Sequence, residues 1–257
     1  MDYSKLLNGK VCIITGGARG QGFQEATLFK QHGGIVYITD ILDGTDAAKS
    51  IGATYLKHDV TSESDWSDIV SKVASENGGR LDVLINNAGV FQKGNVLKET
   101  KEGFERLNAI NTTGVFLGMK HAARTMIDAG NGGAIVNISS IAGLGSSGGL
   151  IAYAASKWAV RGMTKAAANT LAKSNIRVNS IHPGLIQTDM LDEVFTNKTS
   201  KGNAEKNAHV AKSTVPLGRV ADPMEVARLA LFLSSEMSSY STGSEFVVDG
   251  GNMGAAM

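Results

Sequence analysis

The fold is indicated by the stretch Thr15-Gly-Gly-Ala-Arg-Gly-Gln-Gly22, which directly follows the apolar run Val11-Cys-Ile-Ile14. We expect the apolar run to be a buried strand and the residues after the loop to open a helix. Glycines between a strand and a helix let the backbone turn tightly and approach a pyrophosphate group, which the helix N-terminus attracts. The spacing of Gly16, Gly20 and Gly22 departs from the G-x-G-x-x-G pattern, so the loop alone is weak evidence for a dinucleotide site.

Short β-branched runs alternate with longer amphipathic segments along the whole chain, which predicts repeated strand–helix units and a parallel sheet. No linker rich in proline or serine divides the chain. We therefore expect one domain over residues 1–257, an α/β protein with a Rossmann-type doubly wound sheet of about seven parallel strands. The expected strands are 11–15, 35–39, 54–58, 82–86, 134–138, 176–182 and 245–248. The expected helices are 21–32, 45–51, 63–77, 100–128 (broken near 112–114), 152–173 and 223–234.

The composition is ordinary for a globular protein, with 42% hydrophobic and 19% charged residues in a chain of 257. A formal net charge of +1 gives no indication of a nucleic acid or an anionic membrane as partner. Cys12, the single cysteine, lies in an apolar run, which excludes a disulfide framework and favours a reducing compartment. The N-terminus lacks the apolar stretch of a signal peptide, and no run approaches the roughly 18 apolar residues of a membrane span. We expect a soluble, cytoplasmic protein without a metal site.

Asp40 stands at the end of the second expected strand, eighteen residues beyond Gly22. A carboxylate at this point accepts hydrogen bonds from the ribose hydroxyl groups of adenosine and repels a 2′-phosphate. Asp40 therefore favours NAD over NADP. Arg19 in the glycine loop points the other way, because a basic residue there can meet a 2′-phosphate. Its simpler interpretation is a solvated loop charge.

A second informative stretch is Tyr153-Ala-Ala-Ser-Lys157, which begins thirteen residues after Ser140. Residues i and i+4 of a helix lie on one face, so the Lys157 ammonium group can lie beside the Tyr153 hydroxyl. A neighbouring cation favours the phenolate, so we expect the pKa of Tyr153 to be lower than its usual value of about 10. Ser140 would hold the oxygen whose proton moves. The arrangement suits hydride chemistry on a secondary alcohol or a ketone, although Tyr-x-x-x-Lys alone is more often an exposed helix pair.

The glycine loop, the Tyr153–Lys157 motif and the alternating strands and helices together resemble the short-chain dehydrogenase/reductase family, over essentially the whole chain. Three further landmarks occur in the family's order, namely Asn86-Asn-Ala-Gly89, Asn137-Ile-Ser-Ser140 and His182-Pro-Gly-Leu-Ile-Gln-Thr188. Taken alone, each landmark is also compatible with a turn, a cap or a strand end. Together they imply an oxidoreductase that interconverts a secondary alcohol and a ketone with a nicotinamide dinucleotide.

The resemblance also implies roles for single residues. The expected catalytic residues are Asn111, Ser140, Tyr153 and Lys157, with Asn111 supporting a water that relays protons to the lysine. Asn111 is alternatively a helix-kink residue whose side chain bonds the backbone, and the two roles can coexist. We interpret His182 as structural, because Tyr153 already fills the acid/base role. The residues expected to contact the cofactor are Gly16, Arg19, Gly20, Gln21, Gly22, Asp40, Asp59, Val60, Asn87, Ala88, Gly89, Tyr153, Lys157, Pro183, Gly184, Ile186 and Thr188.

Within the family, framework stretches such as 132–140 and 176–184 look closest to bacterial NAD-dependent hydroxysteroid dehydrogenases of the 3α/20β type, and bacterial cyclic-alcohol dehydrogenases share that framework. Residues 141–152 are small and apolar, which predicts a roomy pocket for a hydroxysteroid, a bile acid or another hydrophobic cyclic alcohol. Residues 189–213 are polar and aperiodic, which predicts a substrate lid or, alternatively, a mobile insertion. The residues expected to contact the substrate are Ser140, Ala142, Leu150, Met190, Leu191, Val194 and Phe195. No basic residue is obviously placed for a carboxylate, although Lys93 and Lys198 stay open for that role.

Other interpretations stay open at the level of the sequence. A dehydrogenase of small secondary alcohols or ketones would share the same framework. An acyl-carrier ketoacyl reductase would prefer NADP, which Asp40 opposes. A noncatalytic NAD-binding regulator or a structural subunit could dispense with Tyr153 and Lys157. The alanine-rich helix 152–173 and the family resemblance favour a homotetramer, with the tail 250–257 near another subunit.

Overall fold

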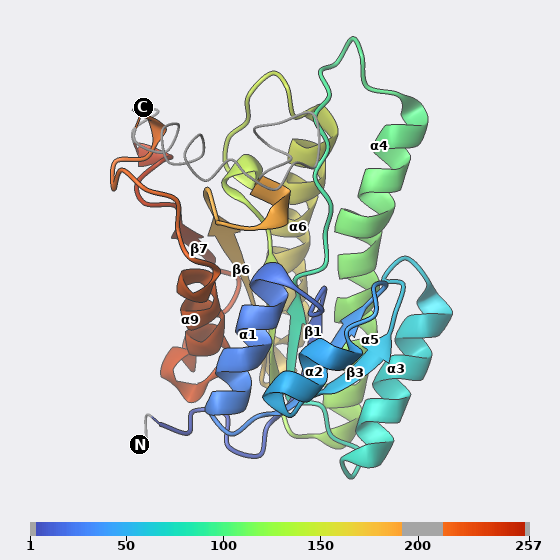
Figure 1. Ribbon diagram of the computed structural model, residues 1–257. Helices are drawn as coiled ribbons and strands as arrows, with labels where there is room; N and C mark the ends of the chain where they lie inside the picture. Colours follow the sequence, from blue (N-terminus) through green and yellow to red (C-terminus); the bar gives the residue numbers. More distant parts are fainter. Residues whose placement is uncertain (1–3, 192–212, 255–257) are drawn as a thin grey trace.

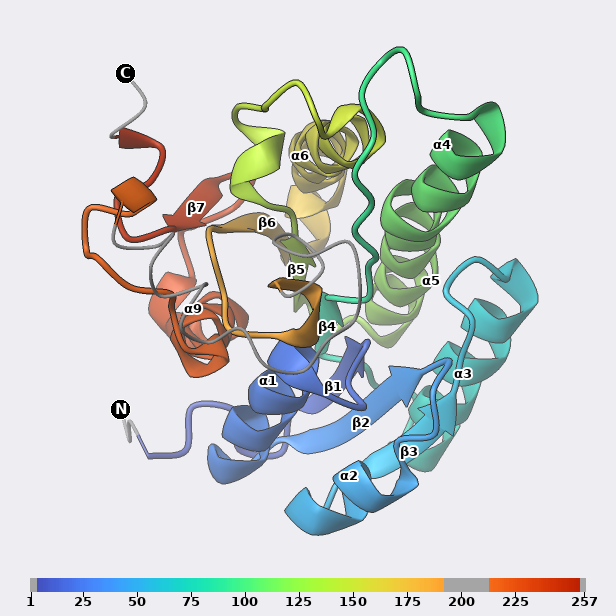
Figure 2. The same cartoon turned by 45° about the horizontal axis from the view of Figure 1, so that its top comes forward.

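A seven-stranded sheet forms the centre of the molecule, and each neighbouring pair of strands is parallel. The computed structural model describes residues 4–191 and 213–254. Its strand order is β3-β2-β1-β4-β5-β6-β7 (Figures 1 and 2). The strands are β1 (Val11–Thr15), β2 (Ile35–Asp40), β3 (Thr54–Lys57), β4 (Val83–Asn86), β5 (Gly133–Ile138), β6 (Ile176–Pro183) and β7 (Glu245–Val248). The seven predicted strands and the Rossmann-type α/β class are confirmed, within one residue at each strand end.

Helices cover both faces of the sheet, as a parallel sheet with crossover connections requires (Figure 1). The helices are α1 (Gly20–Gln31), α2 (Thr45–Ile51), α3 (Glu63–Glu76), α4 (Lys101–Asn108), α5 (Gly114–Ala129), α6 (Ile151–Leu171) and α9 (Pro223–Ser234). Alternate strand residues face opposite layers. Ile14 and Ile38 pack in the core with α1, α2 and α9, whereas Ile13 and Tyr37 pack in the core with α3, α5 and α6. The sheet and its two helical layers form a single domain.

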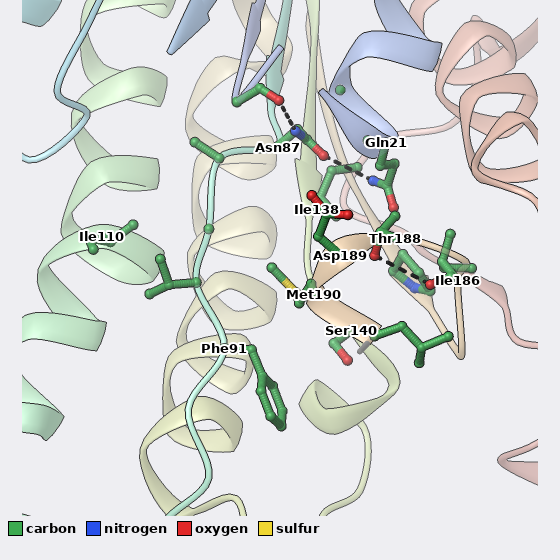
Figure 3. Close-up of a pocket in the computed structure, with 18 of the residues that line it drawn as sticks. Gln21, Asn87, Phe91, Ile110, Ile138, Ser140, Ile186, Thr188, Asp189 and Met190 are labelled. Carbon is green, nitrogen blue, oxygen red and sulfur yellow. Dashed lines mark hydrogen bonds between the residues drawn. The ribbon is translucent and has the colours of Figure 1, made fainter. Parts of the chain in front are cut away.

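The order in which strands are added to the sheet reverses between β1 and β4. Strands β1 to β3 extend the sheet to one side, and β4 to β7 extend it to the other. At such a switch point the connecting loops diverge, and a crevice opens beyond the carboxyl ends of the strands. Gln21, Asn87, Ser140 and Thr188, which follow four different strands, lie together at this edge (Figure 3). The topology therefore gathers the predicted site residues.

The predicted long helix is interrupted where the sequence indicates a break. Between α4 and α5 the residues Ala109–Thr113 form a π-helical turn, which adds a residue to the turn. Asn111 in this turn is fully buried, and its amide accepts a hydrogen bond from Val90 N (2.9 Å) and donates one to Val90 O (2.9 Å). The break is therefore stabilised by the loop that follows β4.

The predicted substrate lid lies mostly outside the described residues. Residues 189–191 begin a helical turn, and residues 192–212, with the predicted substrate residues Val194 and Phe195, are not among those described. Over the described ranges, no helix has both the length and the apolar character needed to cross a membrane.

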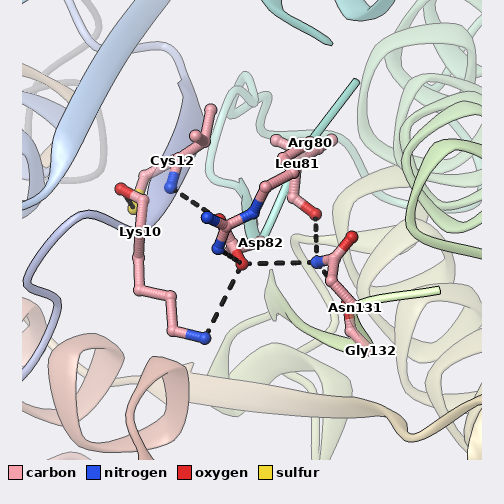
Figure 4. Close-up of polar contacts among 8 residues, drawn as sticks. Lys10, Cys12, Arg80, Leu81, Asp82, Asn131 and Gly132 are labelled. Atoms are coloured by element: carbon pink, nitrogen blue, oxygen red, sulfur yellow. Dashed lines mark hydrogen bonds and ion pairs between the residues drawn. The ribbon is translucent and has the colours of Figure 1, made fainter. Parts of the chain in front are cut away.

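A buried carboxylate, Asp82, joins three strands at the opposite edge of the sheet. It is 2% exposed and accepts hydrogen bonds from Val11 N (2.9 Å) and from the Arg80 guanidinium group (2.9 Å). Lys10 Nζ lies 3.6 Å away, and Asn131 Nδ2 donates to the same carboxylate at 3.3 Å (Figure 4). Asp82, which directly precedes β4, thus connects the beginning of β1 with Asn131, which lies just before β5.

We expect Asp82→Asn to destabilise the protein, because its amide NH₂ group would face donors that now bond the carboxylate. Loss of these charge-assisted bonds should cost about 2–4 kcal/mol, which lowers the thermal midpoint by about 5–10 °C. Thermal unfolding at fixed protein concentration measures the effect. Asp128→Asn, which affects an exposed pair on α5, is the control and should shift the midpoint by less than about 2 °C. Equal midpoints for the two variants would contradict the assigned role.

Candidate active site

A cavity of about 550 Å³ opens at the carboxyl edge of the sheet. Its walls come from the loops that follow β1, β2, β3, β4, β5 and β6. Gln21 and Asn87 lie toward one end of the cavity, and Ser140 and Phe91 lie toward the other (Figure 3). One cavity therefore joins the glycine loop to the Tyr153–Lys157 face of α6.

Every residue that the sequence predicts to contact a cofactor lines this cavity. Of the predicted substrate residues, five line it, namely Ser140, Ala142, Leu150, Met190 and Leu191. Asn111 does not line it. Ile141 and Asp189, which belong to the predicted pocket segment 141–152 and the predicted lid 189–213, also line the cavity. Sequence reasoning missed several other lining residues, most of which flank the recognised motifs: Ile41, Leu42, His58, Val90, Ile110, Ile138, Ser139 and Leu185. Their position next to the ends of predicted strands was the available signal.

The glycine loop leaves room for a ligand backbone and for an anion. Gly16 and Gly20 have φ values of 66° and 58°, which side-chain-bearing residues rarely adopt. A Cβ atom at Gly22 would clash with the Gly16 carbonyl oxygen and lie 2.5 Å from Asn87 Nδ2. The first turn of α1 contains no acidic residue, so its N-terminal N–H groups and positive potential are free for an anion. This construction fits a dinucleotide pyrophosphate.

Two carboxylates and one guanidinium group occupy the rim near the glycine loop. Asp40 accepts hydrogen bonds from Ala18 N (3.1 Å) and Leu42 N (3.0 Å), which hold its carboxylate at the cavity wall. Arg19 pairs instead with Asp189 at 2.7 Å. These two side chains are 65% and 67% exposed, so the pair is solvated and weak. The positive charge of Arg19 is thus balanced by a residue that follows β6.

Tyr153 and Lys157 lie on the buried face of α6. Burial raises the pKa of the Tyr153 phenol, and a hydrogen bond with Ser140 opposes the rise. The expectation that Lys157 lowers this pKa is therefore wrong for this structure. The Lys157 ammonium group lies 5.7 Å from the centre of the Tyr153 ring and donates to Ile138 O at 2.9 Å. Burial lowers the pKa of Lys157 itself to about 8.

Hydrogen bonds hold both the side chain and the backbone carbonyl of Ser140 in place. Its hydroxyl oxygen accepts from Ala142 N at 3.1 Å and caps a short 3₁₀ turn. Its carbonyl oxygen lies 3.0 Å from His182 Nδ1, whose other ring nitrogen contacts Ser180 Oγ at 2.9 Å. A carbonyl only accepts, so His182 carries its proton on Nδ1, and burial lowers the pKa of the ring. His182 is therefore a structural support of Ser140, as predicted.

Asn111 bonds the backbone of Val90, and its Nδ2 also lies 3.2 Å from Ser156 Oγ. The helix-kink interpretation is confirmed, and the proton-relay role stays a prediction. A Cβ atom at Gly89 would lie 3.2 Å from Asn111 Oδ1 and 3.6 Å from Lys157 Nζ. Glycine at this position keeps the space between the two polar groups open.

Comparison with known proteins places the chain in a family. A family model described as enoyl-(acyl carrier protein) reductase matches residues 16–252. A 3-alpha-(or 20-beta)-hydroxysteroid dehydrogenase of Mycobacterium bovis is 42% identical, over 96% of this chain and 90% of that protein. A cyclopentanol dehydrogenase of Comamonas sp. is 42% identical, over 95% and 97% respectively. An NADP-dependent (R)-specific alcohol dehydrogenase of Lentilactobacillus kefiri is 37% identical, over 95% and 97%.

The chain therefore belongs to the short-chain dehydrogenase/reductase family, as its motifs predict. It is an oxidoreductase of CH–OH groups, and the cofactor of this family is a nicotinamide dinucleotide.

We expect Lys157→Met to stabilise the protein while it removes turnover. Because the folded pKa is lowered from 10.5 to about 8, the unfolded state binds more protons between these values. Wild-type stability therefore rises with pH across that window, and the burial cost is fully present below pH 8. Below pH 8 the variant should gain about 2–3 kcal/mol, and this gain should shrink toward pH 10.5. Denaturant unfolding at pH 7 and 9.5 measures both. Lys165→Met, a half-exposed lysine of the same helix, should show no gain; an equal gain there would refute the explanation.

Proposed function

We propose that this chain is an NAD(H)-dependent dehydrogenase that interconverts a secondary alcohol and a ketone on a hydrophobic ring compound, a hydroxysteroid, a bile acid or another cyclic alcohol. The observation that carries the proposal is one cavity with two different ends. The glycine loop and Asp40 line this cavity together with Ser140, Tyr153 and Lys157, and Gln21 and Ser140 lie toward its opposite ends (Figure 3). A dehydrogenase of small secondary alcohols is the alternative that the same geometry allows.

The choice of NAD over NADP is supported by the charges at the rim. Asp40 presents a carboxylate where the adenosine ribose would bind, and a 2′-phosphate there would be repelled. Arg19, the residue that could offset this repulsion, is paired with Asp189. The relative from Lentilactobacillus kefiri is named NADP-dependent, so the preference needs a direct test. Residues of the cavity wall from Gly16 to Thr188 would hold the dinucleotide along its length.

In the proposed mechanism, Tyr153 and Ser140 both act on the oxygen atom of the substrate's alcohol or ketone group. When bound, the dinucleotide accepts a hydride at its nicotinamide C4 in alcohol oxidation and supplies one in ketone reduction. The Tyr153 hydroxyl group gives a proton to the ketone oxygen in reduction, and as phenolate it takes the proton from the alcohol in oxidation. The Ser140 hydroxyl group donates a hydrogen bond to the same oxygen. Because burial raises the pKa of Tyr153, the phenol is protonated at neutral pH and can donate its proton in reduction.

Lys157 and Asn111 support this proton transfer. We assign the Lys157 ammonium group to hydrogen-bonding of the nicotinamide ribose, and with a pKa of about 8 it is mostly charged at neutral pH. Asn111 lies across Gly89 from Lys157. Its proposed role is to position a water that relays protons between Lys157 and solvent.

The apolar lining of the cavity supports a substrate with a hydrophobic ring system. Phe91 packs edge-on against Tyr153, with the ring centres 5.0 Å apart, and Leu150 and Met190 also line the cavity. Among the described lining residues, Arg19 and Lys157 are the only lysine or arginine side chains, and Lys93 does not line the cavity. A carboxylate on the ring would therefore lack a dedicated cation. The names of the Mycobacterium bovis and Comamonas relatives agree with a ring alcohol.

We also propose a cytoplasmic homotetramer with a substrate lid at 189–213. Support for assembly comes from large apolar side chains exposed on three helices that follow one another in the chain. These are Phe104 on α4, Phe116 and Ile127 on α5, and Ile151 and Trp158 on α6. A second copy of the chain would cover such side chains.

The substrate class is tested by nicotinamide absorbance with NAD and NADP in both directions. The panel contains 3-, 7-, 12-, 17- and 20-hydroxysteroids, bile acids and simple cyclic and acyclic alcohols, with their ketones. We expect turnover of a ring compound with NAD, and Tyr153→Phe should lose about 10²–10⁴-fold of the rate while NADH fluorescence shows unchanged binding. Turnover of small acyclic alcohols alone would favour the alternative substrate class. A Tyr153→Phe variant with more than a tenth of the wild-type rate would remove Tyr153 from the mechanism.

Asp40→Ala should change cofactor preference without loss of the fold. Removal of the carboxylate deletes the ribose acceptor and the repulsion of a 2′-phosphate, so the ratio of the NADPH and NADH dissociation constants should fall by about tenfold or more. Fluorescence titration with both cofactors measures this ratio. Asp43→Ala, an exposed carboxylate three residues further on, is the control and should keep the wild-type ratio. An unchanged ratio in Asp40→Ala would mean that another group sets the preference.

A further inference from the structure

A buried carboxyl group lies on α1 behind the glycine loop. Glu25 is fully buried, and its Oε1 accepts a hydrogen bond from Gln21 Nε2 at 3.1 Å. Its second oxygen, Oε2, has no hydrogen-bond partner among the described residues. An ionised carboxylate in such surroundings would be unstable. Burial accordingly raises the pKa of Glu25 to about 8, and the bond from Gln21 only partly opposes this.

Glu25 is connected to the glycine loop through two side-chain amides. Gln21 Nε2 donates to Asn87 Oδ1 at 3.1 Å (Figure 3). The same nitrogen donates to Glu25. Asn87 Nδ2 in turn donates to Thr15 O at 2.9 Å and to Gly16 O at 3.2 Å. Because Gln21 occupies Oδ1, the amide nitrogen of Asn87 is directed at these loop carbonyls. One hydrogen of the Gln21 amide is thus bonded to Asn87. Glu25 accepts the second hydrogen and so fixes the orientation of the Gln21 amide.

The charge state of Glu25 matters because of where α1 begins. The helix N-terminus faces the cavity, and Glu25 is the single acidic residue of α1. As a neutral acid it leaves the positive N-terminal potential intact for an anion. As a carboxylate in a buried, low-dielectric position it would reduce that potential and repel a diphosphate group.

We propose that Glu25 is a positioning residue of the dinucleotide site: as a neutral acid it holds Gln21 against Asn87 behind the glycine loop, and its ionisation weakens diphosphate binding. This inference rests on the proposed function, since it requires a dinucleotide at the glycine loop.

Within the described part of the chain, no other charged group bonds the Gln21 amide. The elements packed against α1 carry the following titratable groups: Glu225 and Arg228 on α9, Tyr37 and Asp40 on β2, Asp46 and Lys49 on α2, and the Cys12 thiol on β1. Among the described residues, Gln21 is the one hydrogen-bond partner of the Glu25 side chain. Glu225 is itself paired with Arg219. The ionisation of Glu25 is therefore governed by its burial and by the Gln21 amide.

The size of the effect follows from linkage. With a pKa of about 8, about nine-tenths of Glu25 is neutral at pH 7 and about one-tenth at pH 9. If the diphosphate binds the neutral form, its apparent dissociation constant rises in proportion to the lost fraction, by about tenfold between these values.

Binding of ADP-ribose at pH 7 and pH 9 tests the proposal by calorimetry, without any turnover. Glu25→Gln should bind like wild type at pH 7, and over this range wild type should lose about tenfold more affinity than Glu25→Gln. Lys157 also titrates in this range, but it is present in both proteins, so their difference isolates Glu25. Glu105→Gln, an exposed residue of α4, is the control and should follow wild type.

Two further variants test the connection through Gln21. Glu25→Ala and Gln21→Met should both bind ADP-ribose more weakly than wild type at pH 7, because neither can fix the Asn87 amide. Thermal midpoints verify that each variant is folded. Equal pH dependence in wild type and Glu25→Gln would overturn this inference and leave the proposed function standing. Absence of ADP-ribose binding to wild type at pH 7 would overturn both.

Discussion

The active edge of this protein depends on hydrogen bonds that continue the pairing of β1 and β4 after their backbones diverge. Backbone pairing between the two strands reaches Ile14 and Ile85. Beyond it, Thr15 Oγ1 donates to Ile85 O and accepts from the backbone N–H groups of Asn87 and Ala88. In the opposite direction, the Asn87 side-chain amide donates hydrogen bonds to the Thr15 and Gly16 carbonyl groups of the glycine loop. Side chains thus satisfy backbone groups at the switch point, and the cavity can open there without exposed, unpaired strand ends.

A second set of buried polar groups places the catalytic helix. Asn86 Nδ2 donates to Asn137 Oδ1, and Asn137 Nδ2 donates to Thr164 Oγ1, which links β4 and β5 to α6. Lys157 adds two hydrogen bonds to this link. Its ammonium group donates to Ile138 O, and its backbone carbonyl accepts from the Ser139 hydroxyl group. Such a network is stable because its members satisfy one another. The burial that positions Lys157 also lowers its pKa. The same burial therefore places the ammonium group precisely and destabilises the folded protein.

The sequence predicts the strands and most of the cavity because both depend on local patterns. Apolar runs bounded by glycine or asparagine mark the strand ends, and a parallel sheet brings those ends to one edge. What depends on distant contacts could not be predicted. The break before Gly114 is visible in the sequence, but its π-helical form depends on Val90, which Asn111 holds. The Tyr153–Lys157 spacing indicates a shared helix face, but not the burial that raises the pKa of the phenol.

The charges around the cavity limit how it can hold an anion. Burial moves Glu25, His58 and Lys157 toward their neutral forms, with pKa values of about 8, 4 and 8. Of the two lysine and arginine side chains among the described lining residues, Arg19 is paired with Asp189 and Lys157 is directed at Ile138 O. No free cation of the described wall is therefore available to a diphosphate at the glycine loop. Its charge has to be met by backbone N–H groups and the N-terminus of α1, which makes the site sensitive to any negative charge that appears on that helix.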